Sequence, residues 1–344
     1  MNRKLYCVIM IGVCLAAAMP ALAAKTKRAA AGPAPLSRNP YIGAIAIDAA
    51  DGRELFADNA DATAYPASIV KLMNLIVILD KIKHGDLKLT DTVKVTAESA
   101  KIGGSQVYLK ENETFTVDEL LYAMMVQSAN DAATALALHV AGSKDAFVEL
   151  MNQKAKEIGL QNTHFASVHG LPPANGQSHD TTTPRDLASL ARTAIQDPDT
   201  LRYSSTRERM FRGGATMLRN HNHLLGTVEG CDGLKTGYFF IAGFSIVATA
   251  QRNNARVITV IMGSQTSQIR DLKARELLLQ GLAKASSVKP PDPLAIAVAP
   301  PMPPPAPASR AWHKLAGALA GGLCIGFITG YLVRAATAGN NRKG

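Results

Sequence analysis

The order of strand-like and helix-like segments constrains the fold of this chain more than any other feature. Residues 41–48 form an alternating, isoleucine-rich run that predicts a strand, and residues 55–58 predict a second strand after the Asp51-Gly52 turn. Residues 233–262 predict three further strands in a meander, and the segment between the two groups is helical in pattern. We therefore expect an α+β fold, with an antiparallel sheet covered by helices and an all-helical lobe.

Helix signals divide the central block. Thr116 and Glu119 form a capping box, and Pro184 follows Thr183 at a first helical position. We expect the active site to lie between the helical lobe and the sheet. The predicted helices cover residues 68–83, 116–127, 131–140 and 143–159, a segment from Thr183 onward, and a closing amphipathic helix over 269–285.

Three short motifs point to acyl transfer by a serine. They are S-x-x-K at residues 68–71, S-x-N at 128–130 and K-T-G at 235–237, in that order. Ser68 and Lys71 are three residues apart at a helix start, so they share one face. A serine hydroxyl needs a base, and Lys71 can act as one only if its pKa falls from about 10.4 to about 7. Burial and a second cation act in that direction.

The other motif residues suit substrate binding and proton transfer. Ser128 can relay a proton to a leaving amine, and Asn130 can hold a substrate amide. Lys235 can supply the second cation, Thr236 can bind a carboxylate, and Gly237 allows close backbone approach. This set predicts a nucleophile, a base, a relay and a carboxylate site around one cleft.

Several longer segments carry a family resemblance. Together they resemble the D-alanyl-D-alanine carboxypeptidases, the low-molecular-mass penicillin-binding proteins, over roughly residues 38–285. The resemblance implies a β-lactamase/transpeptidase-like fold. It also implies hydrolysis of the terminal D-Ala-D-Ala bond of peptidoglycan stem peptides through an acyl-serine at Ser68, with Lys71 as base and β-lactams as inhibitors. The segments are residues 66–74, 103–109, 127–132, 163–171, 183–188 and 232–237.

The same resemblance assigns two further roles. It places the oxyanion at the backbone N–H groups of Ser68 and Tyr238, and it makes Arg270 a ligand of the substrate carboxylate. Ala129 stands where glycine is common in the family, and residues 238–240 (YFF) stand where the family is more polar. From the resemblance we expect a proline-rich spacer and a spanning helix in place of the small β-rich second domain of many members, and we expect no metal or other cofactor.

Other functions remain open. A D,D-endopeptidase that cleaves cross-links is the main alternative, and a catalytically silent peptidoglycan-binding protein is another. A class A β-lactamase would use Glu157 for deacylation, within a segment similar to E-x-x-L-N. A metal enzyme would have to use His169, His221 and His223, without any H-E-x-x-H motif. Cys231 is a weaker candidate nucleophile than Ser68. The favoured interpretation is that it is a small residue without a catalytic role, before Asp232.

The flanking segments predict export and membrane anchoring. Residues 315–333 carry no charge and are long enough to span a bilayer, and Gly322, Gly326 and Gly330 would allow a homodimer through that helix. The net charge of +10 is dispersed, which suits an anionic membrane and gives no support for nucleic-acid binding. We expect a single C-terminal pass in the bacterial inner membrane, with the catalytic domain on the periplasmic or extracellular side. The expected order is a signal peptide (1–24), a linker (25–38), the D,D-peptidase catalytic domain (39–285), a proline-rich linker (286–311), a transmembrane helix (312–334) and a short cytoplasmic tail (335–344).

Overall fold

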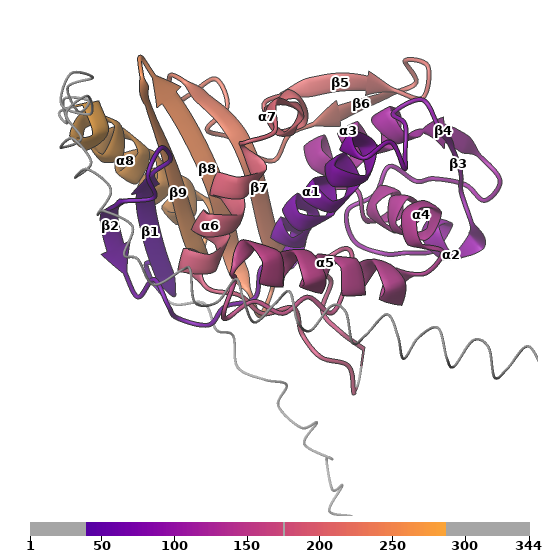
Figure 1. Ribbon diagram of the computed structural model, residues 1–344, viewed down its shortest axis with the longest axis horizontal. Coiled ribbons are helices and arrows are strands. Elements are labelled where there is room, and N and C mark those ends of the chain that lie inside the picture. Colours follow the sequence, from indigo (N-terminus) through magenta and orange to yellow (C-terminus); the bar gives the residue numbers. More distant parts are fainter. Residues whose placement is uncertain (1–38, 175, 287–344) are drawn as a thin grey trace, which may run out of the picture. The chain divides into compact units, whose positions relative to one another are not determined.

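The computed structural model of the protein describes residues 39–174 and 176–286 (Figure 1). The chain divides into two units, residues 1–288 and 289–344, and all described residues lie in the first. The predicted signal peptide, both linkers apart from Ser286, the membrane span and the tail lie outside the described residues. No helix within the described ranges combines the length and apolar character that a membrane crossing needs.

A five-stranded antiparallel sheet is the centre of the domain, as predicted (Figure 1). Its order is β2-β1-β9-β8-β7, so the two N-terminal strands join the three C-terminal ones where β1 pairs with β9. β7 therefore forms one edge of the sheet. The strands are β1 (Gly43–Asp48), β2 (Glu54–Asp58), β7 (Cys231–Phe239), β8 (Gly243–Arg252) and β9 (Ala255–Ser264).

Helices cover both faces of this sheet. Alternate residues of β1 enter different cores, because side chains of a strand point to opposite faces. Ala44 and Ala46 pack in one cluster with Leu277 of α8 (Ser267–Ser286), whereas Ile45 and Ile47 join the larger cluster on the other face. The larger cluster includes α6 (Pro184–Ala194), which begins at the predicted Thr183 cap.

The helical lobe lies on the side of the sheet opposite α8, the face that α6 covers (Figure 1). Its central helix is buried at every residue from Val70 to Leu79, which explains its continuous apolar sequence. The predicted capping box at Thr116 is present, and Gly142 and Gly159 end two helices in left-handed conformation. The lobe contains α1 (Val70–Lys83), α3 (Val117–Val126), α4 (Asn130–Ala141) and α5 (Lys144–Ile158).

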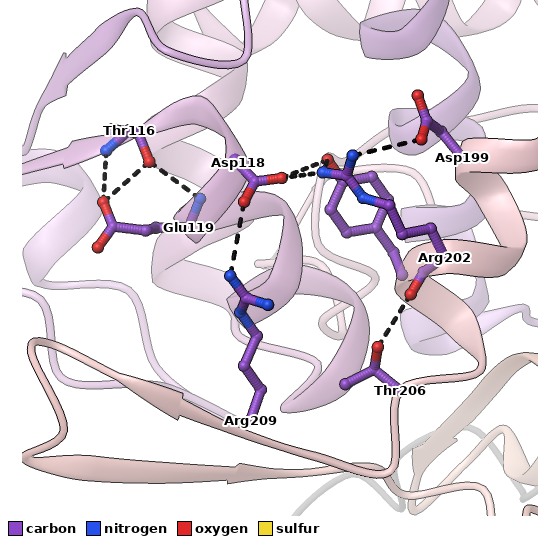
Figure 2. A network of polar contacts seen from close by, with 8 residues as sticks. Thr116, Asp118, Glu119, Asp199, Arg202, Thr206 and Arg209 are labelled. Atoms are coloured by element: carbon purple, nitrogen blue, oxygen red, sulfur yellow. Dashed lines mark hydrogen bonds and ion pairs between the residues drawn. The ribbon is translucent and has the colours of Figure 1, made fainter.

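Short elements were not predicted, because tertiary contacts rather than local pattern stabilise them. One example is the β5–β6 hairpin, which a polar network joins to α3 and α7 (Figure 2). Asp118 accepts hydrogen bonds from Tyr203 Oη at 2.8 Å and from Arg202, and Arg209 stacks over Tyr122 at 3.7 Å. The unpredicted elements are β3 (Thr92–Lys94), α2 (Ala97–Ala100), β4 (Thr114–Thr116), α7 (Pro198–Ser204), β5 (Glu208–Phe211) and β6 (Thr216–Arg219).

Candidate active site

Ser68 lies in a short 3-10 turn (Ala67–Ile69) that leads into α1, slightly before the α-helix itself begins. Two glycines enclose this turn. A Cβ atom at Gly170 would lie 2.0 Å from the Ala67 carbonyl oxygen, and one at Gly237 would lie 2.4 Å from the Pro66 carbonyl oxygen. Gly237 thus admits the backbone of the nucleophile's own segment. The sequence suggested that Gly237 makes room for a substrate backbone. In the structure, the absent side chain makes room first for the protein's own backbone at Pro66.

Lys71 is fully buried and holds three polar groups together. Its Nζ lies 2.9 Å from Ser68 Oγ, 2.7 Å from Asn130 Oδ1 and 2.8 Å from the His169 carbonyl oxygen. Asn130 Nδ2 donates to the Gly103 carbonyl oxygen at 2.8 Å, and this bond orients the amide with its oxygen toward Lys71. The S-x-x-K and S-x-N motifs therefore meet at one amine.

The surroundings of this amine favour its neutral form. Burial, and after it the positive charge of Lys235, lowers the pKa of Lys71 well below its ordinary value. A neutral amine has two N–H groups and one lone pair, and the Asn130 and His169 oxygens can only accept. The lone pair is then left for the Ser68 hydroxyl, which is the arrangement that a general base requires.

Lys235 is the second buried amine, and it contacts the other residue of the S-x-N motif. Its Nζ donates to Ser128 Oγ at 2.8 Å and to the Thr236 carbonyl oxygen at 3.0 Å. Ser128 joins α3 to α4 with φ of 60°. Burial, followed by the charge of Arg270, lowers the pKa of Lys235 to about 7. The three motifs thus form one connected set of side chains.

A cleft of about 450 Å³ opens above these contacts. The buried Lys71 and Lys235 reach it through Ser68 and Ser128, and all the other predicted site residues line it directly. These are Ser68, Ser128, Asn130, Thr236, Gly237, Tyr238 and Arg270. The structure adds Gly104, Ser105, Gly170, Leu171, His221, His223, Phe244 and Ser267.

The walls of the cleft are held by neighbouring groups. The Tyr238 ring stacks on Phe244, with centroids 4.0 Å apart, and Arg270 donates from Nε to Asp271 Oδ1 at 2.8 Å. A Cβ at residue 237 would lie 3.2 Å from the Ser68 nitrogen. The Ser68 nitrogen therefore lies beside β7 at Gly237, the residue before Tyr238.

Sequence reasoning assigned no role to several groups that build this site. The carbonyl groups of Gly103 and His169 orient Asn130 and Lys71. The buried Asp131 carboxylate accepts from the backbone N–H groups of Val107 and Leu109, and so holds the loop that carries Gly103. Residues 103–109 and 163–171 carry part of the family resemblance. Every residue has a backbone carbonyl group, however, so the sequence does not show which of these groups contact Asn130 and Lys71.

The competing catalytic residues lie elsewhere or are chemically unsuited. Glu157 is in the last turn of α5, paired with Lys154 at 2.6 Å, and does not line the cleft, so a deacylating role for it is wrong. Burial raises the pKa of Cys231 to about 11, which disfavours a thiolate. Within residues 39–174 and 176–286, no three His, Cys, Asp or Glu side chains are grouped as metal ligands would be.

Comparison with known sequences decides the family. A model of the D-alanyl-D-alanine carboxypeptidases matches residues 41–266. The chain belongs to this family. It is 38% identical over 257 residues to the D-alanyl-D-alanine carboxypeptidase DacC of Escherichia coli and 33% identical over 238 residues to DacF of Bacillus subtilis. These alignments cover 72% and 68% of the chain, but only 63% and 60% of the relatives, so the chain matches less than two thirds of their length.

Solved structures of family members have the same fold. Penicillin-binding protein 5 of Haemophilus influenzae superposes with a TM-score of 0.66 and 32% identity, covering 73% of the chain and 72% of that protein. Penicillin-binding protein D2 of Listeria monocytogenes, in its ampicillin-bound form, gives 0.65 and 29%, covering 70% and 97%. The predicted transpeptidase-like α+β fold is therefore confirmed.

Proposed function

We propose that this protein is a serine D-Ala-D-Ala carboxypeptidase that trims peptidoglycan stem pentapeptides through an acyl-serine intermediate. The observation that carries the proposal is the hydrogen-bond set of Lys71, which leaves a lone pair for the Ser68 hydroxyl. The family membership and the carboxypeptidase relatives support the choice of substrate. The ampicillin-bound form of the Listeria relative supports sensitivity to β-lactams.

Acylation follows from the positions of these groups. Ser68 Oγ attacks the carbonyl carbon of the penultimate D-Ala while its proton moves to Lys71 Nζ, 2.9 Å away. The N–H groups of Ser68 and Tyr238 stabilise the oxyanion. Thr236 and Arg270 hold the terminal carboxylate, and the positive potential of Lys235 adds to this attraction.

Departure of the terminal D-Ala requires a proton at its nitrogen. We assign to Ser128 the relay of this proton to the leaving amine. Lys235 Nζ donates to Ser128 Oγ at 2.8 Å, which leaves the Ser128 hydroxyl proton available for donation. Water then attacks the acyl-serine, with Lys71 again accepting a proton, and releases the shortened peptide. Every step uses groups that line the cleft or contact it directly.

The test combines labelling with product analysis. Labelled penicillin should attach to Ser68, and purified pentapeptide should lose a single D-Ala by mass. Ser68→Ala should abolish both. Residues 286–289 (SSVK) also read S-x-x-K but follow the predicted catalytic domain, so Ser286→Ala should change neither. Label on Ser128, or D-Ala release by Ser68→Ala, would contradict the proposal.

We also propose, from the sequence alone, that the catalytic domain works outside the cytoplasm on a single C-terminal membrane anchor, with self-association through the Gly322, Gly326 and Gly330 face. The apolar N-terminus and the uncharged stretch 315–333 support this placement. Gly326→Ile should weaken self-association of the isolated segment in a membrane reporter assay. Equal association of parent and variant would exclude that face as an interface.

A further inference from the structure

A buried carboxylate near the catalytic centre has no part in the proposed chemistry. Asp180 is 7% exposed and precedes α6 in the chain. It accepts hydrogen bonds from the N–H groups of Ala166 and Ser167, at 2.7 and 2.9 Å, and from the Ser167 hydroxyl at 2.7 Å. Burial raises the pKa of this carboxyl, and the three hydrogen bonds oppose the rise. Asp180 therefore fixes the chain where a bend over residues 167–170 begins.

The Ser167 hydroxyl carries this constraint to the nucleophile. It donates to Asp180 and accepts from the Gly170 N–H at 2.8 Å, so it closes the bend. Gly170 packs directly on the turn that carries Ser68, since a Cβ there would lie 2.0 Å from the Ala67 carbonyl oxygen and 2.9 Å from the Ser68 nitrogen. A displaced bend would therefore displace Ser68 or leave its turn unsupported.

The same bend reaches the base. The His169 carbonyl oxygen lies within the bend and accepts from Lys71 Nζ at 2.8 Å. Asp180 also faces Lys71 with its charge, which raises the pKa of that amine against the larger opposing effects of burial and Lys235. Asp180 is thus linked separately to the nucleophile and to the base. The remaining charged or titratable groups that face Lys71 are Asp131, whose charge has the same effect, and the imidazoles of His169 and His221.

We propose that Asp180 is a positioning residue for acylation, which acts on Ser68 through the bend and on Lys71 through the bend and its own charge. This inference rests on the proposed acyl-serine chemistry. The groups proposed to hold the substrate carboxylate, Thr236 and Arg270, belong to β7 and α8 and lie outside the bend. Loss of the constraint should therefore slow the chemical step and leave substrate binding unchanged.

The experiment breaks the constraint in two ways in the full-length enzyme. Ser167→Ala removes the hydroxyl but keeps the Asp180 charge, whereas Asp180→Asn removes the charge and keeps the shape. Both should lower kcat for D-Ala release about tenfold at an unchanged KM. Only Asp180→Asn should also move the acidic limb of the pH profile to lower pH, because Lys71 loses a facing negative charge and binds its proton less readily. Ser167→Thr keeps the hydroxyl and should keep the parent kcat.

Asp186→Asn is the matched control. Asp186 is also a buried carboxylate, and it accepts from the Asn162 N–H at 2.7 Å and the Thr163 hydroxyl at 2.8 Å, before the bend. Its replacement should lower the melting temperature and leave kcat unchanged.

Three results would each overturn the inference and leave the proposed function standing. They are a parent kcat in Ser167→Ala, a kcat loss in Asp186→Asn as large as in Asp180→Asn, and an acidic limb that Asp180→Asn does not move. If Asp180→Asn does not fold, the comparison of Ser167→Ala with Ser167→Thr decides alone. Absence of D-Ala release and of penicillin label at Ser68 in the wild type would instead contradict the proposed function.

Discussion

At the scale of single residues, two buried lysines with different partners divide the work of the site. Lys71 contacts the nucleophile and two carbonyl oxygens, whereas Lys235 contacts Ser128 and faces the charge of Arg270. One amine must be neutral to accept a proton, and the other is useful to an anionic substrate only when charged. Their opposite requirements can be tested separately.

Replacement of Lys71 tests the base. Lys71→Arg should slow penicillin acylation at least about 100-fold, because a guanidinium stays protonated and cannot take the Ser68 proton. The acylation rate is measured by stopped reaction with labelled penicillin. Lys101→Arg, on an exposed side chain, should react at the parent rate. Near-normal acylation by Lys71→Arg would exclude Lys71 as the base.

The pH profile tests both amines. As pH falls through the lowered pKa of Lys71, the amine gains a proton and kcat/KM for D-Ala release should fall. As pH rises above about 7, Lys235 loses its charge and carboxylate binding should weaken, so the profile should be bell-shaped. Lys235→Arg keeps its charge and should move the descending limb to higher pH. A descending limb at the same pH would assign it to another group.

Gly170 allows a test of the nucleophile turn. Gly170→Ala should abolish penicillin labelling and destabilise the fold, because its Cβ would overlap the Ala67 carbonyl oxygen. Gly159→Ala is the matched control, since its φ of 84° is equally left-handed but the space around it is open. That control should cost about 1–2 kcal/mol of unfolding free energy and keep the label. Normal labelling in Gly170→Ala would show that the turn tolerates displacement.

At the scale of elements, the 3-10 turn that leads into α1 supplies Ser68, α1 supplies Lys71 and β7 supplies the K-T-G residues, and the helix and the strand were both predictable. Their apolar runs and motif residues mark them in the sequence. The β3–β4 pair, α7 and the β5–β6 hairpin were not found, because each is short and depends on side chains distant in sequence. The same holds within the site. Ser68, Lys71 and Asn130 could be named in advance, but the carbonyl oxygens that complete the Lys71 environment could not.

The β5–β6 hairpin offers a test of such distant contacts. Asp118→Asn should weaken its network with Arg202 and Tyr203, lower the unfolding free energy by about 1–2 kcal/mol, and speed amide exchange in residues 208–219 (Figure 2). Asp145→Asn controls for the loss of a first-turn carboxylate in another helix. Equal effects of the two variants would assign the stability to helix dipoles rather than to this network.

At the scale of the whole molecule, the predicted membrane anchor (312–334) and the predicted catalytic domain (39–285) are different segments of the chain, so attachment and hydrolysis can be tested separately. Deleting residues 310–344 should release an enzyme that hydrolyses D-Ala-D-Ala at the parent rate, since every described site residue precedes this segment. Sedimentation assays on membrane fractions measure the release. A truncated protein that still sediments with membranes would reveal a second attachment.

The pairing of β1 with β9 has a consequence for how the protein is made. Gly43 is paired with Met262 and Asp48 with Val257, so the first strand to be synthesised cannot form this pairing until the last strand has been synthesised. Until residue 264 has been translated, a nascent chain can hold Ser68 and Lys71 but neither the completed sheet nor its final strand. Contacts so distant in sequence slow folding. A prematurely terminated message would therefore yield a chain without hydrolytic capacity. The strand order thus delays activity until nearly the whole domain has been synthesised.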